Sequence, residues 1–161
     1  MTRCSIELGF AERERDQIAA LLREYEAGLG VSLCFQGFAA EVAGLPGAYA
    51  PPRGEMLLAH EVGGGGLAGL VALRPAPDAP ELCEMKRLYV RPAARGSGLG
   101  RQLAIAALEQ AQRLGYRRMC LDTLPSMTEA QALYRSLGFR QTGTSATEPV
   151  VLLFERELAP Q

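Results

Sequence analysis

Three glycines in five residues, Gly96, Gly98 and Gly100, form the most distinctive local pattern in the chain. They follow an apolar run with strand-like alternation at residues 82–90 and precede a run with helical spacing at residues 98–114. A strand that leads through a glycine-rich turn into a helix directs backbone N–H groups and the positive end of the helix dipole at one point. The spacing therefore predicts a binding site for phosphate or another anion.

Two common phosphate-binding motifs do not fit this turn. A dinucleotide-binding Rossmann turn has the spacing G-x-G-x-x-G, whereas the glycines here follow G-x-G-x-G without a repeated strand–helix–strand half. A P-loop needs Lys and then Ser or Thr after its last glycine, where this chain has Arg101 and Gln102. At this point a purely structural turn also stays open.

The elements that would position this turn alternate between strand and helix patterns along the whole chain. Residues 82–123 read as strand–helix–strand, which predicts a parallel pair, and the earlier strands read as an antiparallel meander. We expect one mixed α/β domain over residues 1–161. The expected strands are 2–9, 56–62, 67–73, 82–90, 118–123, 139–142 and 150–157, and the expected helices are 11–28, 38–43, 98–114 and one that Ser126 and Glu129 begin as a capping box.

Composition excludes several classes of protein. The chain has 161 residues, 48% of them hydrophobic, and a formal net charge of −1, which gives no electrostatic case for binding nucleic acid or a membrane surface. The four cysteines form no C-x-x-C pair and there is one histidine, so we expect no metal site. The polar N-terminus and the lack of a long apolar run predict a cytoplasmic protein without a signal peptide.

The stretch LYVRPAARGSGLG, from Leu88 to Gly100, resembles the acetyl-coenzyme A motif of the GNAT N-acetyltransferases. The family signature is [Q/R]-x-x-G-x-[G/A], which Arg95, Gly98 and Gly100 meet after a V-x-P sequence. A second family pattern, A-x-x-[L/F]-Y-x-x-x-G-F, matches residues 130–139. The resemblance implies the GNAT (acyl-CoA N-acyltransferase) fold, a mostly antiparallel sheet with one splayed parallel pair, flanked by helices.

The resemblance also implies how acetyl-coenzyme A would be held. Backbone amides of the glycine turn would bind the pyrophosphate, and the pantetheine arm would lie along the strand that precedes it. A backbone N–H near Leu88 or Tyr89 would face the thioester carbonyl. Arg91 and Arg135 are further candidates for phosphate contacts. The expected coenzyme-binding residues are Leu88, Tyr89, Val90, Arg95, Gly96, Ser97, Gly98, Leu99, Gly100 and Arg101.

Two residues are expected to carry the chemistry. Tyr134 matches the family tyrosine that protonates the leaving sulfur, although its spacing on an apolar helix face also suits a core tyrosine. Glu84 is the expected general base, directly or through water, with an ion pair to an arginine on a neighbouring strand as the alternative. His60, the only histidine, is a further candidate base, and Asp122 is assigned no chemistry.

The acceptor site is expected outside the matched motifs. Phe35 and Tyr49 are candidate walls, the latter on a turn-rich loop at residues 44–54 that is long enough to cover a site. One departure from the family concerns the coenzyme: many members have an asparagine seven residues before the tyrosine, where this chain has Met127.

The resemblance implies an N-acetyltransferase that moves acetyl from acetyl-coenzyme A directly to a primary amine of a small molecule or peptide, without a covalent enzyme intermediate. A non-catalytic module that binds or senses acyl-coenzyme A keeps the glycine turn but lacks a working base. A structural α/β domain is a third reading. The sequence leaves the acceptor open, as well as the choice between monomer and homodimer.

Overall fold

The computed structural model describes residues 3–160, apart from the side chain of Phe35. Its strands form one seven-stranded sheet in the order β1-β2-β3-β4-β5-β7-β6. Neighbouring strands are antiparallel except β4 and β5, which are parallel. This confirms the predicted mixed sheet with an initial meander. The strands are β1 (Cys4–Leu8), β2 (Glu55–Glu61), β3 (Leu67–Ala76), β4 (Ala79–Val90), β5 (Arg118–Thr123), β6 (Arg140–Thr144) and β7 (Leu152–Glu157).

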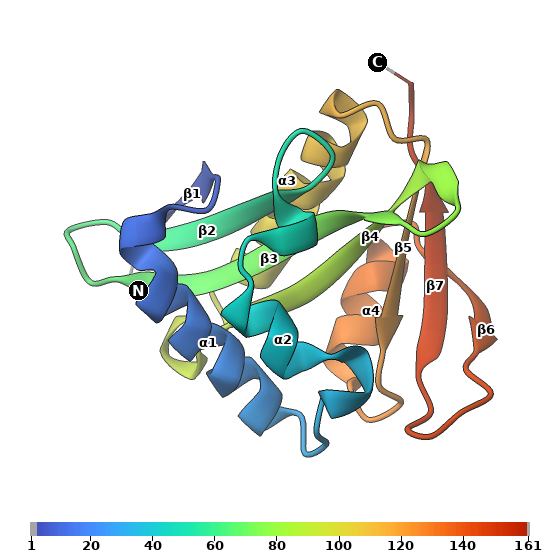
Figure 1. Cartoon of the computed structure of the whole chain (residues 1–161), viewed down its shortest axis with the longest axis horizontal. Helices are drawn as coiled ribbons and strands as arrows, with labels where there is room; N and C mark the ends of the chain where they lie inside the picture. The colour runs from blue at the N-terminus through green and yellow to red at the C-terminus, as the bar shows by residue number, and fades with distance from the viewer. Residues whose placement is uncertain (1–2, 161) are drawn as a thin grey trace.

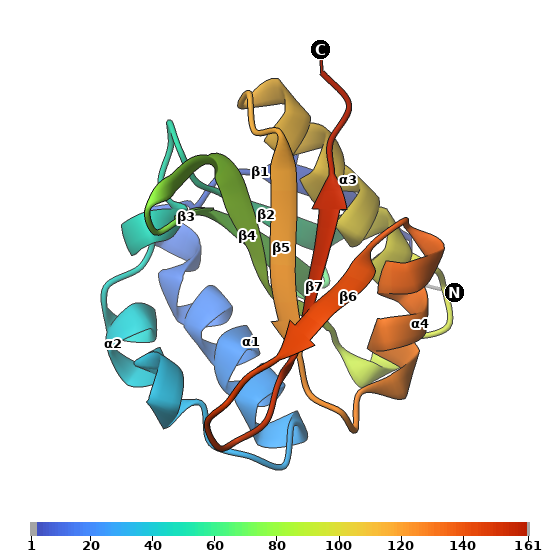
Figure 2. The same cartoon turned by 90° about the vertical axis from the view of Figure 1, so that its right-hand side faces the viewer.

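Helices cover both faces of the sheet. Figure 2 shows α1 and α2 on one side of the strands and α3 and α4 on the other. The helices are α1 (Arg15–Gly28), α2 (Phe38–Ala43), α3 (Leu99–Arg113) and α4 (Thr128–Ser136), with short 3-10 turns η1 (Glu12–Glu14), η2 (Cys34–Gln36), η3 (Gly47–Tyr49) and η4 (Pro92–Ala94).

The sheet has a hydrophobic core on each face because successive strand residues point to opposite sides. In β2, Leu57 and Ala59 pack into the core that contains α3 and Tyr134, whereas Met56 and Leu58 pack into the core beneath α1 and α2. Both faces of β2 are therefore buried, which explains its continuous apolar sequence.

The parallel pair of strands separates halfway along its length. β4 and β5 pair only from Leu82 with Arg118 to Glu84 with Cys120, after which β5 pairs with β7 alone. Figure 1 shows β5 and β7 running steeply across the direction of β2 and β3. The edge of β4 from Met85 to Val90 therefore faces no strand among the described residues, which confirms the splayed pair.

A bulge interrupts β4 within this open stretch. Its register against β3 shifts by one residue between the pairs Ala72–Lys86 and Leu70–Tyr89. Arg87 has a positive φ of 63°, a conformation that costs a non-glycine residue on the order of 1–3 kcal/mol and persists only where its surroundings enforce it. The bulge brings the side chains of the consecutive residues Lys86 and Arg87 to the same pocket.

Two local predictions were wrong. The capping box at Ser126 does not form, because α4 begins at Thr128 with Met127 as its N-cap and no side-chain cap. The Ser126 carbonyl instead accepts a hydrogen bond from the Thr128 N–H at 3.0 Å. The strands expected at residues 67–73 and 82–90 are longer than predicted, since β3 extends to Ala76 and β4 begins at Ala79. Within the described residues, no helix has the length and apolar character needed to cross a membrane.

Candidate active site

A groove begins where β4 and β5 separate. Its inner part, the inner pocket, lies between the bulge of β4, the end of β5 and Tyr134 of α4. Its outer part, the outer groove, continues along Leu88, Tyr89 and Val90 to Arg95 at the glycine turn. The two parts share Tyr25, Leu29, Leu88 and Met127, so they form one continuous depression.

The glycine turn leaves its amides free. Gly96 and Gly98 have φ values of 82° and 83°, which L-residues rarely adopt, and Gly98 is the N-cap of α3. None of the backbone N–H groups from Gly96 to Arg101 donates a hydrogen bond to another described residue. Consecutive free amides at a helix N-terminus are suited to binding a phosphate group.

The open edge of β4 offers further backbone groups. The Arg91 N–H donates to Ala68 of β3 at 2.8 Å, and Tyr89 pairs with Leu70 on the same side. Because hydrogen-bonding direction alternates along a strand, the N–H and C=O groups of Leu88 and Val90 point away from β3, toward the open edge. The Val90 carbonyl accepts a hydrogen bond from Arg95 Nε at 2.9 Å. An extended ligand with amide groups would find strand-like partners here.

The predicted phosphate-binding arginines have protein partners in this structure. Arg95 lies over the Tyr89 ring, with its guanidinium 5.6 Å from the ring centroid. Arg101 donates to Ser136 at 2.8 Å, and Arg91 forms a 3.0 Å ion pair with Glu24. Arg135 lies over the Phe154 ring and donates to Gln141. Of these four side chains, only that of Arg95 lines the outer groove.

Tyr134 is buried beside the inner pocket. Its ring makes an edge contact with Phe139 and a tilted contact with Phe154, and it lines the pocket next to Met85 and Met127. Its hydroxyl has no hydrogen-bond partner among the described residues, whereas the Tyr116 hydroxyl donates to the Arg53 carbonyl at 2.6 Å. Burial, with smaller contributions from Tyr25 and Asp122, raises the pKa of Tyr134, so the hydroxyl stays protonated at neutral pH. It can therefore donate a proton into the pocket.

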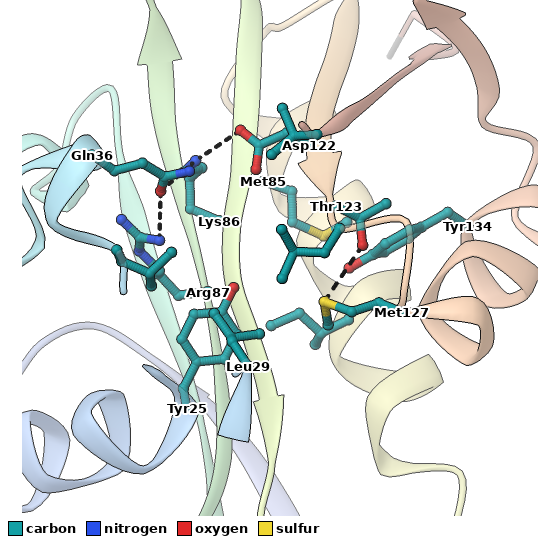
Figure 3. Close-up of a pocket in the computed structure, with 14 residues that line it drawn as sticks. Tyr25, Leu29, Gln36, Met85, Lys86, Arg87, Asp122, Thr123, Met127 and Tyr134 are labelled. Atoms are coloured by element: carbon teal, nitrogen blue, oxygen red, sulfur yellow. Dashed lines mark hydrogen bonds and ion pairs between the residues drawn. The ribbon is translucent and has the colours of Figure 1, made fainter. Parts of the chain in front are cut away.

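Charged side chains gather at the other end of the inner pocket. Lys86 Nζ lies 3.2 Å from Asp122 Oδ2 and 3.4 Å from Gln36 Oε1. Arg87 forms a two-pronged ion pair with Glu41, with both distances 2.9 Å, and donates to Gln36 at 2.7 Å. Figure 3 shows Gln36, Lys86 and Arg87 together on one side of the view, with Thr123, Met127 and Tyr134 on the other. The pocket thus joins a charged end to a neutral proton donor.

The two bases expected from the sequence lie outside the residues that line the inner pocket. Glu84 Oε1 is 3.4 Å from Arg74 Nε, the ion pair that was the alternative for this residue. His60 Nε2 is 2.6 Å from Glu14, and its other nitrogen lies 3.8 Å from Glu7. The base role of Glu84 stays a prediction. Asp122, to which the sequence assigned no chemistry, is the carboxylate that lines the pocket.

Neither Phe35 nor Tyr49, the two candidate walls of the acceptor site, is seen to line the groove with a described side chain. The side chain of Phe35 lies outside the described part of the structure, although its backbone belongs to η2, next to Gln36. Tyr49 is buried in the core beneath α1 and α2 and lines neither part of the groove. The position of Tyr49 favours a structural role.

Sequence reasoning missed Tyr25, Gln36 and Lys86 as lining residues. Tyr25 stands on the apolar face of α1, where its spacing reads as core, and Gln36 lies in a short 3-10 turn without a motif. Lys86, the single lysine of the chain, was the available signal, because a lone lysine within an apolar strand needs a partner.

Two cysteines of the sheet have no features of a nucleophile. Burial raises the pKa of the Cys83 and Cys120 thiols to about 12, so both stay protonated at neutral pH. Neither lines the groove. Acyl transfer through either thiol is therefore disfavoured.

Comparison with known proteins gives a consistent result. The model of the acetyltransferase (GNAT) family matches residues 34–139. The chain is 40% identical to an uncharacterized N-acetyltransferase of Schizosaccharomyces pombe over 138 residues, which cover 86% of this chain and 83% of that protein. It is also 44% identical over 78 residues to the uncharacterized N-acetyltransferase YjgM of Escherichia coli, a match that covers 48% of this chain and 44% of that protein.

Solved structures share the fold at low identity. A GNAT-family acetyltransferase from Staphylococcus aureus superposes with a TM-score of 0.79 at 14% identity, covering 96% of this chain and all of that one. At this identity the likeness concerns the arrangement of strands and helices alone.

Proposed function

The chain belongs to the acetyltransferase (GNAT) family, and we propose that it transfers acetyl from acetyl-coenzyme A directly to a primary amine. One observation carries the proposal. The groove opened by the separation of β4 and β5 runs from Arg95, next to the free amides of the glycine turn, to Tyr134, whose hydroxyl has no partner among the described residues. A thioester needs an anion site for its coenzyme and a proton donor for its sulfur, and the groove offers both.

The residues of the groove suit acetyl-coenzyme A, which would supply the reactive thioester. The amides from Gly96 to Arg101 would bind the pyrophosphate, with Arg95 adding charge-assisted hydrogen bonds. The backbone of Leu88 and Val90 would pair with the pantetheine amides, and the Leu88 N–H would donate to the thioester oxygen. Tyr134 would protonate the departing sulfur, because a thiolate with a pKa near 8.5 leaves more readily with a donor.

The acceptor amine must lose a proton before it attacks. A lysine-like amine has a pKa of about 10.4, so only roughly one molecule in a thousand is free base at pH 7. We propose Asp122 as the group that accepts this proton, directly or through water, because its carboxylate lines the inner pocket and 28% of its side chain is exposed there. The nitrogen–acetyl bond forms and the carbon–sulfur bond breaks. The first amine proton passes to Asp122 before attack, and the second, released as the amide forms, replaces through water the proton that Tyr134 gives to the sulfur.

The pH dependence of kcat/KM separates Asp122 from Glu84 as the base. Loss of the true base should remove the limb of the profile that rises with pH. We expect Asp122→Asn to flatten this limb and Glu84→Gln to keep it. The opposite outcome would return the role to Glu84. An unchanged profile in both variants would mean that neither carboxylate is the base and that water accepts the amine proton.

A module that binds acyl-coenzyme A without catalysis is not favoured, because the matched relatives of this chain are named N-acetyltransferases. The test is release of the coenzyme thiol from acetyl-coenzyme A with a broad panel of primary amines, alongside a direct measurement of coenzyme binding. Acetyl transfer predicts amine-dependent thiol release and an acetylated product of the expected mass. Tight binding without release for any amine would disprove the proposal.

A further inference from the structure

Two buried cations lie at one end of the inner pocket. Lys86 and Arg87 both line it because the bulge in β4 turns two consecutive side chains to one side. Their side chains are only 4% and 2% exposed. Burying a cation costs several kcal/mol unless hydrogen bonds and opposite charge replace water. The partners of these two groups therefore show what this end of the pocket can bind.

Protein groups satisfy only part of their donor capacity. Arg87 uses three of its five N–H groups, two on Glu41 and one on Gln36. Lys86 uses two of its three, at the long distances of 3.2 and 3.4 Å, and shares the Gln36 oxygen with Arg87. One N–H of Lys86 thus has no protein partner among the described residues. Arg87 also interacts with the Tyr25 hydroxyl, and its guanidinium lies 5.0 Å from the centroid of the Phe38 ring. An anionic acceptor group beside Lys86 would complete the set.

The charge of Lys86 is balanced only while Asp122 stays paired with it. Glu41 neutralises Arg87 from outside the pocket, so Lys86 relies on Asp122, the only carboxylate among the described residues that line the inner pocket. An acceptor ammonium is drawn to the same carboxylate, which would leave Lys86 buried without an anion. A simple amine creates this imbalance, whereas an acceptor that brings its own carboxylate removes it.

We infer that the acceptor is a small amino acid-like molecule, with a carboxylate on the carbon that carries the amine or on the next one. This inference rests on the proposed acetyl transfer and names its substrate class. The carboxylate binds the free N–H of Lys86, next to the positive charge of Arg87, and the amine points to Asp122 and the thioester. Polyamines and lysine side chains in basic peptides are disfavoured, because they would add positive charge beside two buried cations.

Matched acceptors test this inference on the wild-type enzyme. Alanine, methionine and phenylalanine are each compared with the primary amide and the decarboxylated amine of the same side chain, by thiol release and product mass. We expect kcat/KM at least 30-fold higher for the best amino acid than for its two partners. The amide has the less basic amine and thus more free base, so amine reactivity alone would favour the amide. Equal or higher kcat/KM for amides or simple amines would overturn the inference.

A variant separates carboxylate recognition from general damage. Lys86→Gln should raise the KM of the preferred amino acid about tenfold, whereas the KM of its decarboxylated amine should stay the same or fall. Arg118→Gln is the matched control, since Arg118 forms ion pairs with Glu81 and Glu155 outside the groove. An equal rise for both acceptors, or no rise, would contradict the inference. The wild-type comparison of matched acceptors stands if the variant does not fold.

A binding measurement distinguishes failure of this inference from failure of the proposed function. If no amine of any class releases thiol, the proposed transfer fails. Thermal unfolding with coenzyme A present then tests the acceptor site alone: amino acids should raise the melting temperature and their amides should not. Stabilisation by both, or by neither, would overturn carboxylate recognition in that case as well.

Discussion

The two ends of the groove are built in different ways. At the glycine turn the groups available for binding are the free backbone amides from Gly96 to Arg101, set by two residues with positive φ at the start of α3. At the charged end of the inner pocket they are side chains from η2, β4 and β5, held by buried ion pairs. A backbone site keeps its geometry through one local segment, whereas a side-chain site depends on several elements meeting correctly. The two ends should therefore respond differently to substitution.

The largest effect is expected from breaking the buried ion pair at the charged end. Arg87→Met leaves Glu41 without its partner in a site where the carboxylate is only 13% exposed. Removing one member of a buried pair costs about 3–5 kcal/mol. We expect this loss in the free energy of unfolding measured with urea. The double variant Arg87→Met/Glu41→Leu should recover most of it.

The control for Arg87 is Arg118→Met, which breaks more exposed ion pairs with Glu81 and Glu155. Such pairs contribute about 0–1 kcal/mol. If both single variants lose the same small amount of stability, the charged end does not depend on its internal pairing, and the contrast between the two ends fails.

Tyr134→Phe should slow the chemical step without weakening binding at the glycine turn or at the charged end of the inner pocket. We expect kcat to fall about 100-fold, because a positioned general acid contributes roughly 10²–10⁴ in rate, while the KM for acetyl-coenzyme A stays within twofold. Tyr116→Phe is the control, since this buried tyrosine donates to the Arg53 carbonyl away from the groove. Steady-state thiol release gives both parameters. A kcat within twofold of wild type would end the assignment of Tyr134.

The pKa of Tyr134 adds a pH dependence to the same test. Burial raises this pKa above the ordinary value of about 10, so the hydroxyl keeps its proton throughout the range from pH 6 to pH 10. Wild-type kcat should therefore not decline between pH 8 and pH 10 through loss of this acid. A fall in kcat between pH 8 and pH 10 that disappears in Tyr134→Phe would contradict the raised pKa of Tyr134.

The glycine turn should respond to a change in backbone conformation. Gly98 and Gly63 both have positive φ and open space where a Cβ would stand. Alanine at either position should cost about 1–2 kcal/mol of stability. Only Gly98→Ala should raise the KM for acetyl-coenzyme A, by about tenfold, because it disturbs the amides at the start of α3. Comparable KM values in the two variants would remove the turn from coenzyme binding.

The sequence predicted the backbone end of the groove better than the side-chain end for a physical reason. The glycines and Tyr134 belong to short motifs whose residues act within one local segment, and α2 and β5 have the predicted bounds. The parallel pair followed from the strand–helix–strand pattern of residues 82–123. These features depend on spacing along the chain, which the sequence displays directly.

The charged end depends on contacts across the fold. Strict alternation in β4 would place Arg87 opposite Lys86, and only the bulge brings both to the pocket. Lys86 and Asp122 are 36 residues apart and meet because β5 diverges from β4 just beyond Cys120. The same limit applies to Glu84, whose position on the correct strand could not reveal its contact with Arg74.

The smallest effect is expected where the two parts of the groove meet. Met127 lines both, at the position where many family members have an asparagine, and its sulfur accepts a 3.6 Å hydrogen bond from Thr123. Met127→Asn would add an amide beside the expected path of the pantetheine arm. Since one net hydrogen bond contributes about 0.5–1.5 kcal/mol, we expect the Kd for acetyl-coenzyme A to fall about threefold to fivefold.

Met127→Leu is the control for this change, because it removes the sulfur without adding an amide and should leave the Kd unchanged. Isothermal titration with coenzyme A and acetyl-coenzyme A measures both variants. Tighter binding in the asparagine variant alone would mean that this chain holds the arm mainly through the backbone of Leu88 and Val90, with room for a side-chain contact. Weaker binding would mean that the apolar surface of Met127 already packs on the arm, and side chains would then contribute to the coenzyme end as they do to the charged end.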